Sequence, residues 1–213
     1  ATVSLGAVWS LCAPDMGAAT VLERFRQIEP KAIVTASGYA FGGKWRDRSA
    51  EVSELLAGLP TLAAWISMDT AENVDGGALA RTGWAALCAS GPRLTPEMLP
   101  FDHPLWIVYS SGTTGTPKAI VHSHGGVMLE HLKLLGLHCD IGADDVFAWY
   151  SSTGWIMWNV QVGGLLTGAA VAIAEGSPGY PDNGRLWRFI ERAGVTVFGA
   201  GAAWYIACMK AGI

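Results

Sequence analysis

The stretch that decides the fold is Leu-Trp-Ile-Val-Tyr-Ser-Ser-Gly-Thr-Thr-Gly-Thr-Pro-Lys-Ala-Ile-Val, residues 105–121. It begins with the apolar run 105–109 and ends with the apolar run 119–121, and each run predicts a short buried strand. Residues 110–116 between them are all glycine, serine or threonine, and Pro117 and Lys118 follow. Glycines let backbone N–H groups turn toward an anion, hydroxyls add donors, and lysine supplies a full positive charge. The stretch therefore predicts a polyphosphate-binding loop between two strands.

Two better-known phosphate-binding loops do not match this chain. A Walker loop requires Gly-x-x-x-x-Gly-Lys-Ser/Thr, whereas Lys118 follows Pro117 and precedes Ala119. The dinucleotide-binding pattern Gly-x-Gly-x-x-Gly comes nearest at residues 199–204, where Trp204 takes the place of the third glycine. We interpret that segment as a plain turn between a strand and a helix.

The composition bounds the class of protein. Of the 213 residues 51% are hydrophobic and only 15% are charged, which favours buried sheets over a disordered chain. The net charge of −4 gives no general attraction to nucleic acid or to anionic lipid, so a phosphate site has to be local. No apolar run approaches the ~20 residues of a spanning helix, and no secretory signal pattern is visible. The four cysteines form no Cys-x-x-Cys pair, which predicts buried, reduced thiols in a cytoplasmic protein.

Predicted helices and strands alternate along most of the chain. Before the loop, helices are predicted over 17–28 and 48–56, and strands over 31–37 and 62–66. After it, helices are predicted over 123–137, 155–166, 185–192 and 202–210, and strands over 145–150, 169–174 and 195–198. Nearly continuous apolar strands that alternate with helices are typical of an α/β fold with largely parallel sheets and crossover helices.

Residues 69–103 differ from the rest, because glycines and prolines interrupt them and only 79–88 reads as a short helix. We interpret them as a connection between two sheet-containing α/β subdomains, residues 1–68 and 104–213. Both ends of the chain read as helical, so we expect an internal piece of a longer protein. The rest of that polypeptide would then be its main partner.

The loop resembles the phosphate-binding signature of the adenylate-forming (acyl-activating) superfamily, Ser-Ser/Gly-Gly-Ser/Thr-Thr-Gly-x-Pro-Lys. Every position from Ser110 to Lys118 fits, and the flanking residues 101–106 and 119–126 resemble the members that act on short-chain carboxylates. The resemblance implies an ATP-dependent acyl-coenzyme A ligase. In such enzymes a carboxylate attacks the α-phosphorus of ATP and releases pyrophosphate, and the coenzyme A thiol then displaces AMP from the acyl-adenylate.

The same resemblance implies the roles of the loop residues. The β- and γ-phosphates would be held by Ser110, Ser111, Gly112, Thr113, Thr114, Gly115 and Lys118, of which Thr113, Thr114 and Lys118 would serve the chemistry. Mg²⁺ would bridge the phosphates, and its protein ligand is expected to be a glutamate in a downstream motif outside these residues.

Two further segments are candidate sites. Residues 150–159 follow a predicted strand and open a helix, at the edge where open α/β sheets bind ligands. The resemblance places Trp155 beside the acyl and pantetheine pocket, with Met157, Trp158 and Asn159 as weaker candidates; core packing is the alternative for the tryptophans. Residues 38–44 resemble the region that contacts the coenzyme A nucleotide, which suggests Gly43 and Lys44. Relatives often carry an arginine near Ala40, and Lys44 can equally belong to a solvated face.

Several alternatives stay open at this point. His122, His124 and His131 have only Glu130 as a further ligand at suitable spacing, so no metal site is predicted there. Acetoacetate is the expected carboxylate, with acetate or propionate as alternatives. A nucleotide-binding module without catalysis is the alternative from another class, and we expect the isolated fragment to be inactive.

Overall fold

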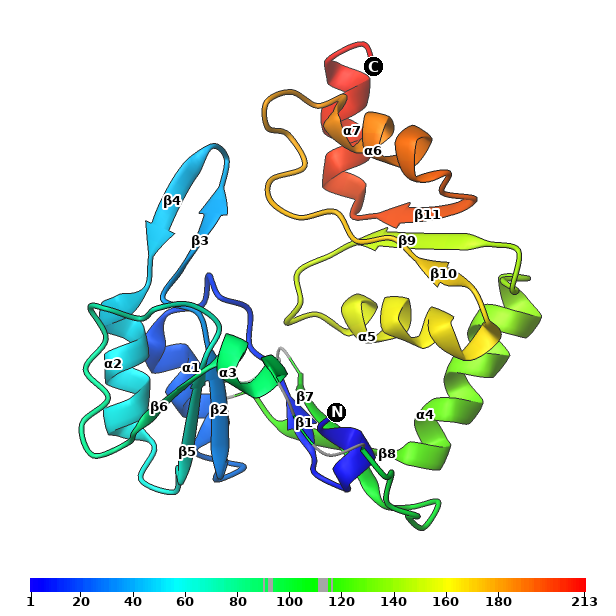
Figure 1. Ribbon diagram of the computed structural model, residues 1–213. Helices are drawn as coiled ribbons and strands as arrows, with labels where there is room; N and C mark the ends of the chain where they lie inside the picture. The colour runs from blue at the N-terminus through cyan, green and yellow to red at the C-terminus, as the bar shows by residue number, and fades with distance from the viewer. Residues whose placement is uncertain (90, 92–93, 111–114, 116) are drawn as a thin grey trace. The chain divides into compact units, whose positions relative to one another are not determined.

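The computed structural model describes residues 1–89, 91, 94–110, 115 and 117–213. Within them the strands form three three-stranded sheets and one two-stranded sheet (Figure 1). The pairs β1–β7, β2–β5, β5–β6, β9–β10 and β9–β11 are all parallel. The predicted α/β class with largely parallel sheets is therefore confirmed.

The chain divides into two compact units, which we describe separately. The first unit comprises residues 1–39, 45–98 and 106–121. Its helical elements are η1 (Val3–Leu5), α1 (Ala18–Phe25), α2 (Ser49–Gly58) and α3 (Trp84–Ala89). Its strands are β1 (Trp9–Ser10), β2 (Ala32–Thr35), β5 (Ala64–Ser67) and β6 (Arg81–Gly83), together with most of β7 (Pro104–Tyr109) and β8 (Ala119–Ser123).

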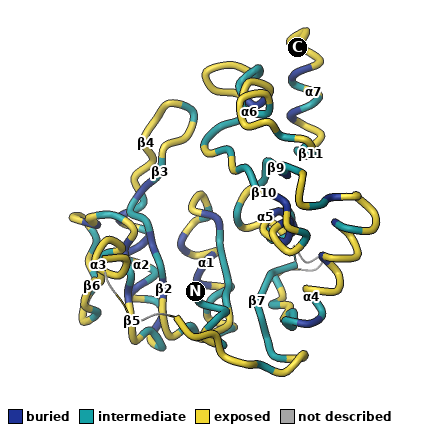
Figure 2. Tube along the Cα trace, turned by 45° about the vertical axis from the view of Figure 1, so that its right-hand side comes forward, coloured by how far each residue is buried: buried dark blue, intermediate teal, exposed yellow. Residues whose placement is uncertain are grey.

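The core of the first unit lies where β2 and β5 meet α1 and α2. Ile33 and Trp65 are opposite each other in the ladder, and both are buried. Leu22 of α1 and the pair Val52 and Leu56 of α2 pack against them. Val52 and Leu56 are four residues apart and so share one face of their helix. Figure 2 marks the buried residues of these elements in dark blue.

The second unit comprises residues 40–44, 99–105 and 122–213. Its sheet has β9 (Val146–Tyr150) in the middle, with β10 (Ala170–Val171) and β11 (Val197–Ala200) on either side. Its helical elements are α4 (His124–His131), the π-helix η2 (Leu132–His138), α5 (Ile156–Gly163), η3 (Gly164–Thr167), α6 (Arg185–Ala193) and α7 (Ala202–Lys210). One core cluster surrounds Phe147 of β9, and a second joins Leu186 of α6 to Trp204 and Cys208 of α7.

Every predicted helix and strand has a counterpart, but several strands differ from the prediction. Residues 81–83 lie inside the predicted short helix 79–88 but form β6, which pairs with β5, and the helix there begins only at Trp84. This edge strand is largely exposed, so it carries no alternating apolar pattern. The predicted strand 169–174 is paired only at Ala170 and Val171.

Residues 38–47, which the sequence suggested only as a ligand contact, form the hairpin of β3 (Gly38–Phe41) and β4 (Lys44–Asp47). Its two-residue turn, Gly42 and Gly43, has φ values of 60° and 74°. Positive φ at both positions is what a type I′ turn requires, and glycine adopts it without strain.

All four cysteines are free, as predicted. The prediction that they are buried is wrong for Cys88 and Cys139, which are exposed; only Cys208 is fully buried. Cys88 lies on α3, which contributes no buried residue, and Cys139 caps η2. In the part of the chain that the structure describes, no helix has the length and apolar character needed to cross a membrane.

Candidate active site

The predicted phosphate loop connects β7 to β8, which are neighbours in one sheet. The Ser110 N–H donates to the Lys118 carbonyl at 3.1 Å, and this bond closes the base of the loop. Because the Ser110 amide is used there, its hydroxyl is the group it can offer to a phosphate. Gly115 has φ of +133°, a conformation that favours glycine. The Lys118 side chain is exposed. The predicted residues Ser111, Gly112, Thr113 and Thr114 lie outside the described residues.

The arm of the loop on the β7 side is attached to α1. The Tyr109 hydroxyl donates to the Arg24 carbonyl at 3.1 Å, and the Arg24 guanidinium lies 5.8 Å from the centre of the Tyr109 ring. Burial raises the pKa of Tyr109, so the hydroxyl keeps its proton and donates at neutral pH.

The start of α4 is locked to the segment that precedes β7. The His124 N–H donates to the His103 carbonyl and the Gly125 N–H to the Phe101 carbonyl, both at 2.9 Å. The Ser123 hydroxyl accepts from the Gly126 N–H at 3.3 Å. A side chain at Gly125 would place Cβ 2.1 Å from the Phe101 ring. These first amides of α4 are therefore satisfied within the protein.

The second predicted site lies at the carboxyl end of β9. Trp155 immediately precedes α5 and is 56% exposed, so it is not a core residue. Trp158 is partly buried. Met157 is also partly buried and packs against the cluster around Phe147. Trp155 is thus the aromatic side chain of this segment that is open to a ligand, and Met157 supports the core next to it.

Gln161 is a feature of this region that the sequence reading missed. Its side chain is 2% exposed, and its Oε1 accepts from the Trp149 N–H of β9 at 3.0 Å. Its Nε2 donates to the Ala172 carbonyl, just after β10, also at 3.0 Å. The Ala172 N–H still donates directly to the Phe147 carbonyl at 2.9 Å. β9 and the segment that follows β10 are therefore bonded directly up to the Ala172 N–H. Beyond it, the Gln161 side-chain amide bridges the two. The signal available in the sequence was a single glutamine within the apolar helix 156–163.

The segment after β10 is held through three successive carbonyl groups. The Tyr150 hydroxyl donates to the Gly176 carbonyl at 2.7 Å. Arg185 donates to the carbonyls of Ser177, at 3.0 Å, and of Glu175. Residues 175–177 thus lie at a fixed position relative to the carboxyl end of β9.

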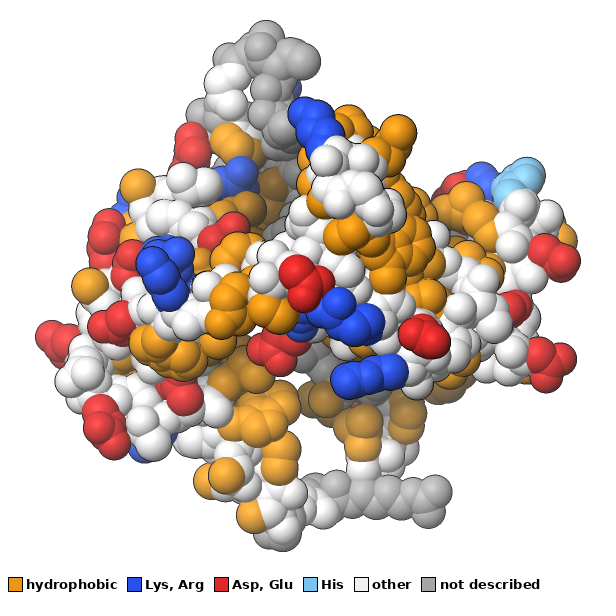
Figure 3. Space-filling model, turned by 90° about the horizontal axis from the view of Figure 1, so that it is seen from above, with side chains coloured by type: hydrophobic (Ala, Val, Ile, Leu, Met, Phe, Trp, Pro, Cys, Tyr) orange, Lys and Arg blue, Asp and Glu red, His pale blue; other side chains and the backbone are white. Residues whose placement is uncertain are grey.

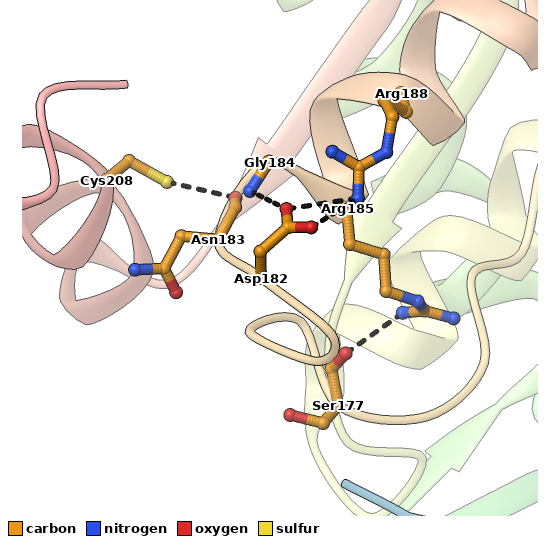
Figure 4. Close-up of polar contacts among 7 residues, drawn as sticks. All are labelled: Ser177, Asp182, Asn183, Gly184, Arg185, Arg188 and Cys208. Atoms are coloured by element: carbon orange, nitrogen blue, oxygen red, sulfur yellow. Dashed lines mark hydrogen bonds and ion pairs between the residues drawn. The ribbon is translucent and has the colours of Figure 1, made fainter. Parts of the chain in front are cut away.

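The start of α6 is fixed by Asp182 (Figure 4). Its carboxylate accepts from the Gly184 N–H at 2.8 Å and from the Arg188 guanidinium at 2.9 and 3.0 Å. The hydrogen bond from Arg188 holds the pKa of Asp182 below its usual value, so the carboxylate is ionised at neutral pH. The Cys208 thiol of α7 lies 3.6 Å from the Asn183 carbonyl and ties α7 to the same turn. The polar groups of this turn are thus used to join α6 and α7.

The remaining predicted residues lie at the hairpin. Gly43 is in its turn, and the exposed Lys44 begins β4. Among residues 1–89, 91, 94–110, 115 and 117–213, no group of three His, Cys, Asp or Glu side chains is placed to hold a metal ion.

Large apolar side chains are exposed in both units. Examples are Trp45 in the first unit and Leu137 in the second, with 64% and 80% of their surface exposed. Figure 3 shows hydrophobic side chains, in orange, at the surface among charged ones.

Known proteins resemble the chain over nearly all of its length. A family model described as AMP-binding enzyme matches residues 1–213. The chain is 40% identical over 213 residues to an acetoacetyl-CoA synthetase of Gallus gallus, covering 96% of this chain and 32% of that protein. It is also 40% identical over 217 residues to an acetoacetyl-coenzyme A synthetase of Rhizobium meliloti, covering 100% of this chain and 33% of that protein. A solved structure of acetoacetyl-CoA synthetase from Streptomyces lividans superimposes with a TM-score of 0.93 at 51% identity, covering 100% of this chain and 32% of that one. The chain thus spans about a third of the length of these relatives.

Proposed function

This chain belongs to the family of AMP-binding enzymes, and we propose that the polypeptide containing it is an acetoacetate–coenzyme A ligase that forms AMP. The observation that carries the proposal is the complete signature from Ser110 to Lys118, between adjacent strands of a chain that matches acetoacetyl-CoA synthetases over almost its whole length. The reaction would use ATP, acetoacetate and coenzyme A.

In the first step the carboxylate oxygen of acetoacetate attacks the α-phosphorus of ATP, and pyrophosphate leaves. Negative charge then builds up on the leaving β- and γ-phosphates. The task of this chain is to hold those phosphates and to offset that charge, which is the kind of catalysis that depends on fixed donors and cations. We assign this task to the Lys118 ammonium, to Ser110 and Ser111, and to the glycine and threonine residues 112–115. Trp155 would line the pocket for the acyl group, with Met157 behind it.

In the second step the coenzyme A thiol attacks the acyl carbon of the adenylate, and AMP leaves. We propose Gly43 and Lys44 as contacts for the coenzyme A nucleotide, because Gly43 lies in the hairpin turn and is directly followed by the exposed Lys44. Mg²⁺ is expected on the phosphates of ATP. The family resemblance suggests that its protein ligand is a glutamate in another part of the polypeptide.

The rest of the polypeptide would complete the site. The relatives are about three times as long as this chain, and exposed side chains such as Trp45 and Leu137 are suited to packing against further segments. The division into subdomains 1–68 and 104–213 remains our proposal. We also place the enzyme in the cytoplasm, with support from its four free cysteines.

The test is Lys118→Ala in the full-length polypeptide. We expect the rate of ATP–pyrophosphate exchange with acetoacetate to fall about 10–1000-fold, the range for losing one preorganised donor or charge. Lys133→Ala is the matched control, because Lys133 is an exposed lysine that pairs with Glu130 at 2.6 Å on the surface of the second unit. Exchange that is the same in the wild type and in Lys118→Ala would refute the proposed role.

A further inference from the structure

Gln27 lies two residues after the end of α1 and contacts the chain on both sides of Lys118. Its Nε2 donates to the Pro117 carbonyl at 2.9 Å, and its Oε1 accepts from the Ala119 N–H at 3.3 Å. Nε2 also donates to the Glu23 carbonyl, four residues earlier in the chain, at 3.0 Å. The Gln27 NH₂ group thus donates to two carbonyls and the Gln27 amide oxygen accepts from one N–H, so both the donor and the acceptor of the side chain are satisfied.

Lys118 itself is held from the opposite side. Its carbonyl accepts from the Ser110 N–H at the end of β7, at 3.1 Å. The backbone around Lys118 is therefore bonded to β7 on one side and to the Gln27 amide on the other. A side-chain amide offers the same donor and acceptor as a peptide group, so Gln27 takes the place of a neighbouring strand. This arrangement fixes the backbone of residue 118 and, with it, the direction in which the lysine side chain leaves the chain.

The two arms of the loop share this attachment to α1. The β7 arm is bonded to it through Tyr109 and Arg24, and the β8 arm through Gln27. Arg24 and Gln27 are three residues apart and so lie on the same side of the helix end. The end of α1 therefore fixes the positions of both ends of the phosphate loop.

We propose that Gln27 is a positioning residue for Lys118, which acts through the lysine backbone without touching the substrate. This inference rests on the proposed function of Lys118. Displacement of a positioned group by about 1 Å can cost up to ~100-fold in rate. We therefore expect Gln27→Met, which keeps the length of the side chain and removes the amide, to slow adenylate formation about 5–50-fold. The KM for ATP should rise, and the KM for coenzyme A should stay unchanged.

The experiment is a double-mutant cycle in the full-length polypeptide, with Gln27→Met, Lys118→Ala and the two combined, followed by ATP–pyrophosphate exchange. If Gln27 acts through Lys118, Gln27→Met lowers the rate in the wild-type background and has no further effect in the Lys118→Ala background. Arg26→Met is the matched control, because Arg26 leaves the same helix end and donates to the Gly58 carbonyl at 3.2 Å, in α2. It should retain the wild-type rate.

The outcomes separate the two hypotheses. Wild-type kinetics in Gln27→Met, or an equal loss of rate in both backgrounds, overturns the positioning role of Gln27. A large loss of rate in Lys118→Ala still upholds the proposed function in that case. Wild-type exchange in Lys118→Ala refutes both. Amide hydrogen exchange gives a readout that does not depend on activity. The Ala119 amide should exchange faster in Gln27→Met while the amides of β2 keep their rates; an unchanged Ala119 rate, or faster exchange in both places, overturns the inference.

Discussion

Gln161 gives the sharpest test of how the second unit is built. Gln161→Met keeps the length of this buried side chain and removes its amide, which leaves the Trp149 N–H and the Ala172 carbonyl without their partner. Each backbone group is partly buried, so each loss costs about 1–2 kcal/mol, and the two together lower the free energy of unfolding by about 2–4 kcal/mol. This exceeds the effect of most surface substitutions, which stay within about 0.5 kcal/mol.

The assay is urea denaturation of the chain followed by tryptophan fluorescence, together with amide hydrogen exchange at Trp149. Val162→Met is the matched control, because Val162 is the next residue of α5 and is 39% exposed. Gln161→Met should unfold at a clearly lower urea concentration than both the wild type and Val162→Met, and its Trp149 amide should exchange faster.

The same unfolding midpoint in Gln161→Met and in the wild type would refute this reasoning. The strands would then be able to pair directly once the amide is gone, and Gln161 would be a filler of space. An unchanged exchange rate at Trp149 would lead to the same conclusion.

Two further predictions concern stability. Gly199→Ala should destabilise the chain by about 1–3 kcal/mol, because the added Cβ would lie 2.1 Å from the Trp149 ring, whereas Gly201→Ala meets nothing within 4 Å; equal melting temperatures for the two variants would contradict this. Asp69 is a pH-sensitive group of the first unit. Burial raises its pKa, but hydrogen bonds from Ser37, Ser67 and Ala71 lower it more, so the net pKa lies below the ordinary value. The contribution of Asp69 to the free energy of unfolding is fully present at neutral pH. It is lost as the pH falls below about 3.9, the pKa of an aspartate in the unfolded state, and through the lower pKa of the folded state. Asp69→Asn should therefore flatten the acid limb of unfolding free energy against pH, and an equally steep limb in both proteins would refute the assignment.

Local patterns in the sequence predicted the elements that bury an apolar face. The helix at 17–28 was visible because Val21, Leu22, Phe25 and Ile28 lie at helical spacing, and Leu22 and Phe25 pack in the core. The candidate phosphate loop could be identified because its residues are contiguous, from Ser110 to Lys118. The exposed strand β6 left no such trace, because a strand without a buried face needs no alternation.

The sequence by itself determined the α/β class with largely parallel sheets and the family signature, since each was read from patterns of residues that are close together in the chain. Only the tertiary structure revealed the hydrogen-bond partners of Gln27 and Gln161. Gln27 meets partners 90 and 92 residues away, and Gln161 joins the ends of two strands. The physical reason is that a glutamine amide bonds equally well to any peptide group or to water. Its residue type therefore says nothing about its partner until the fold brings one within hydrogen-bond distance.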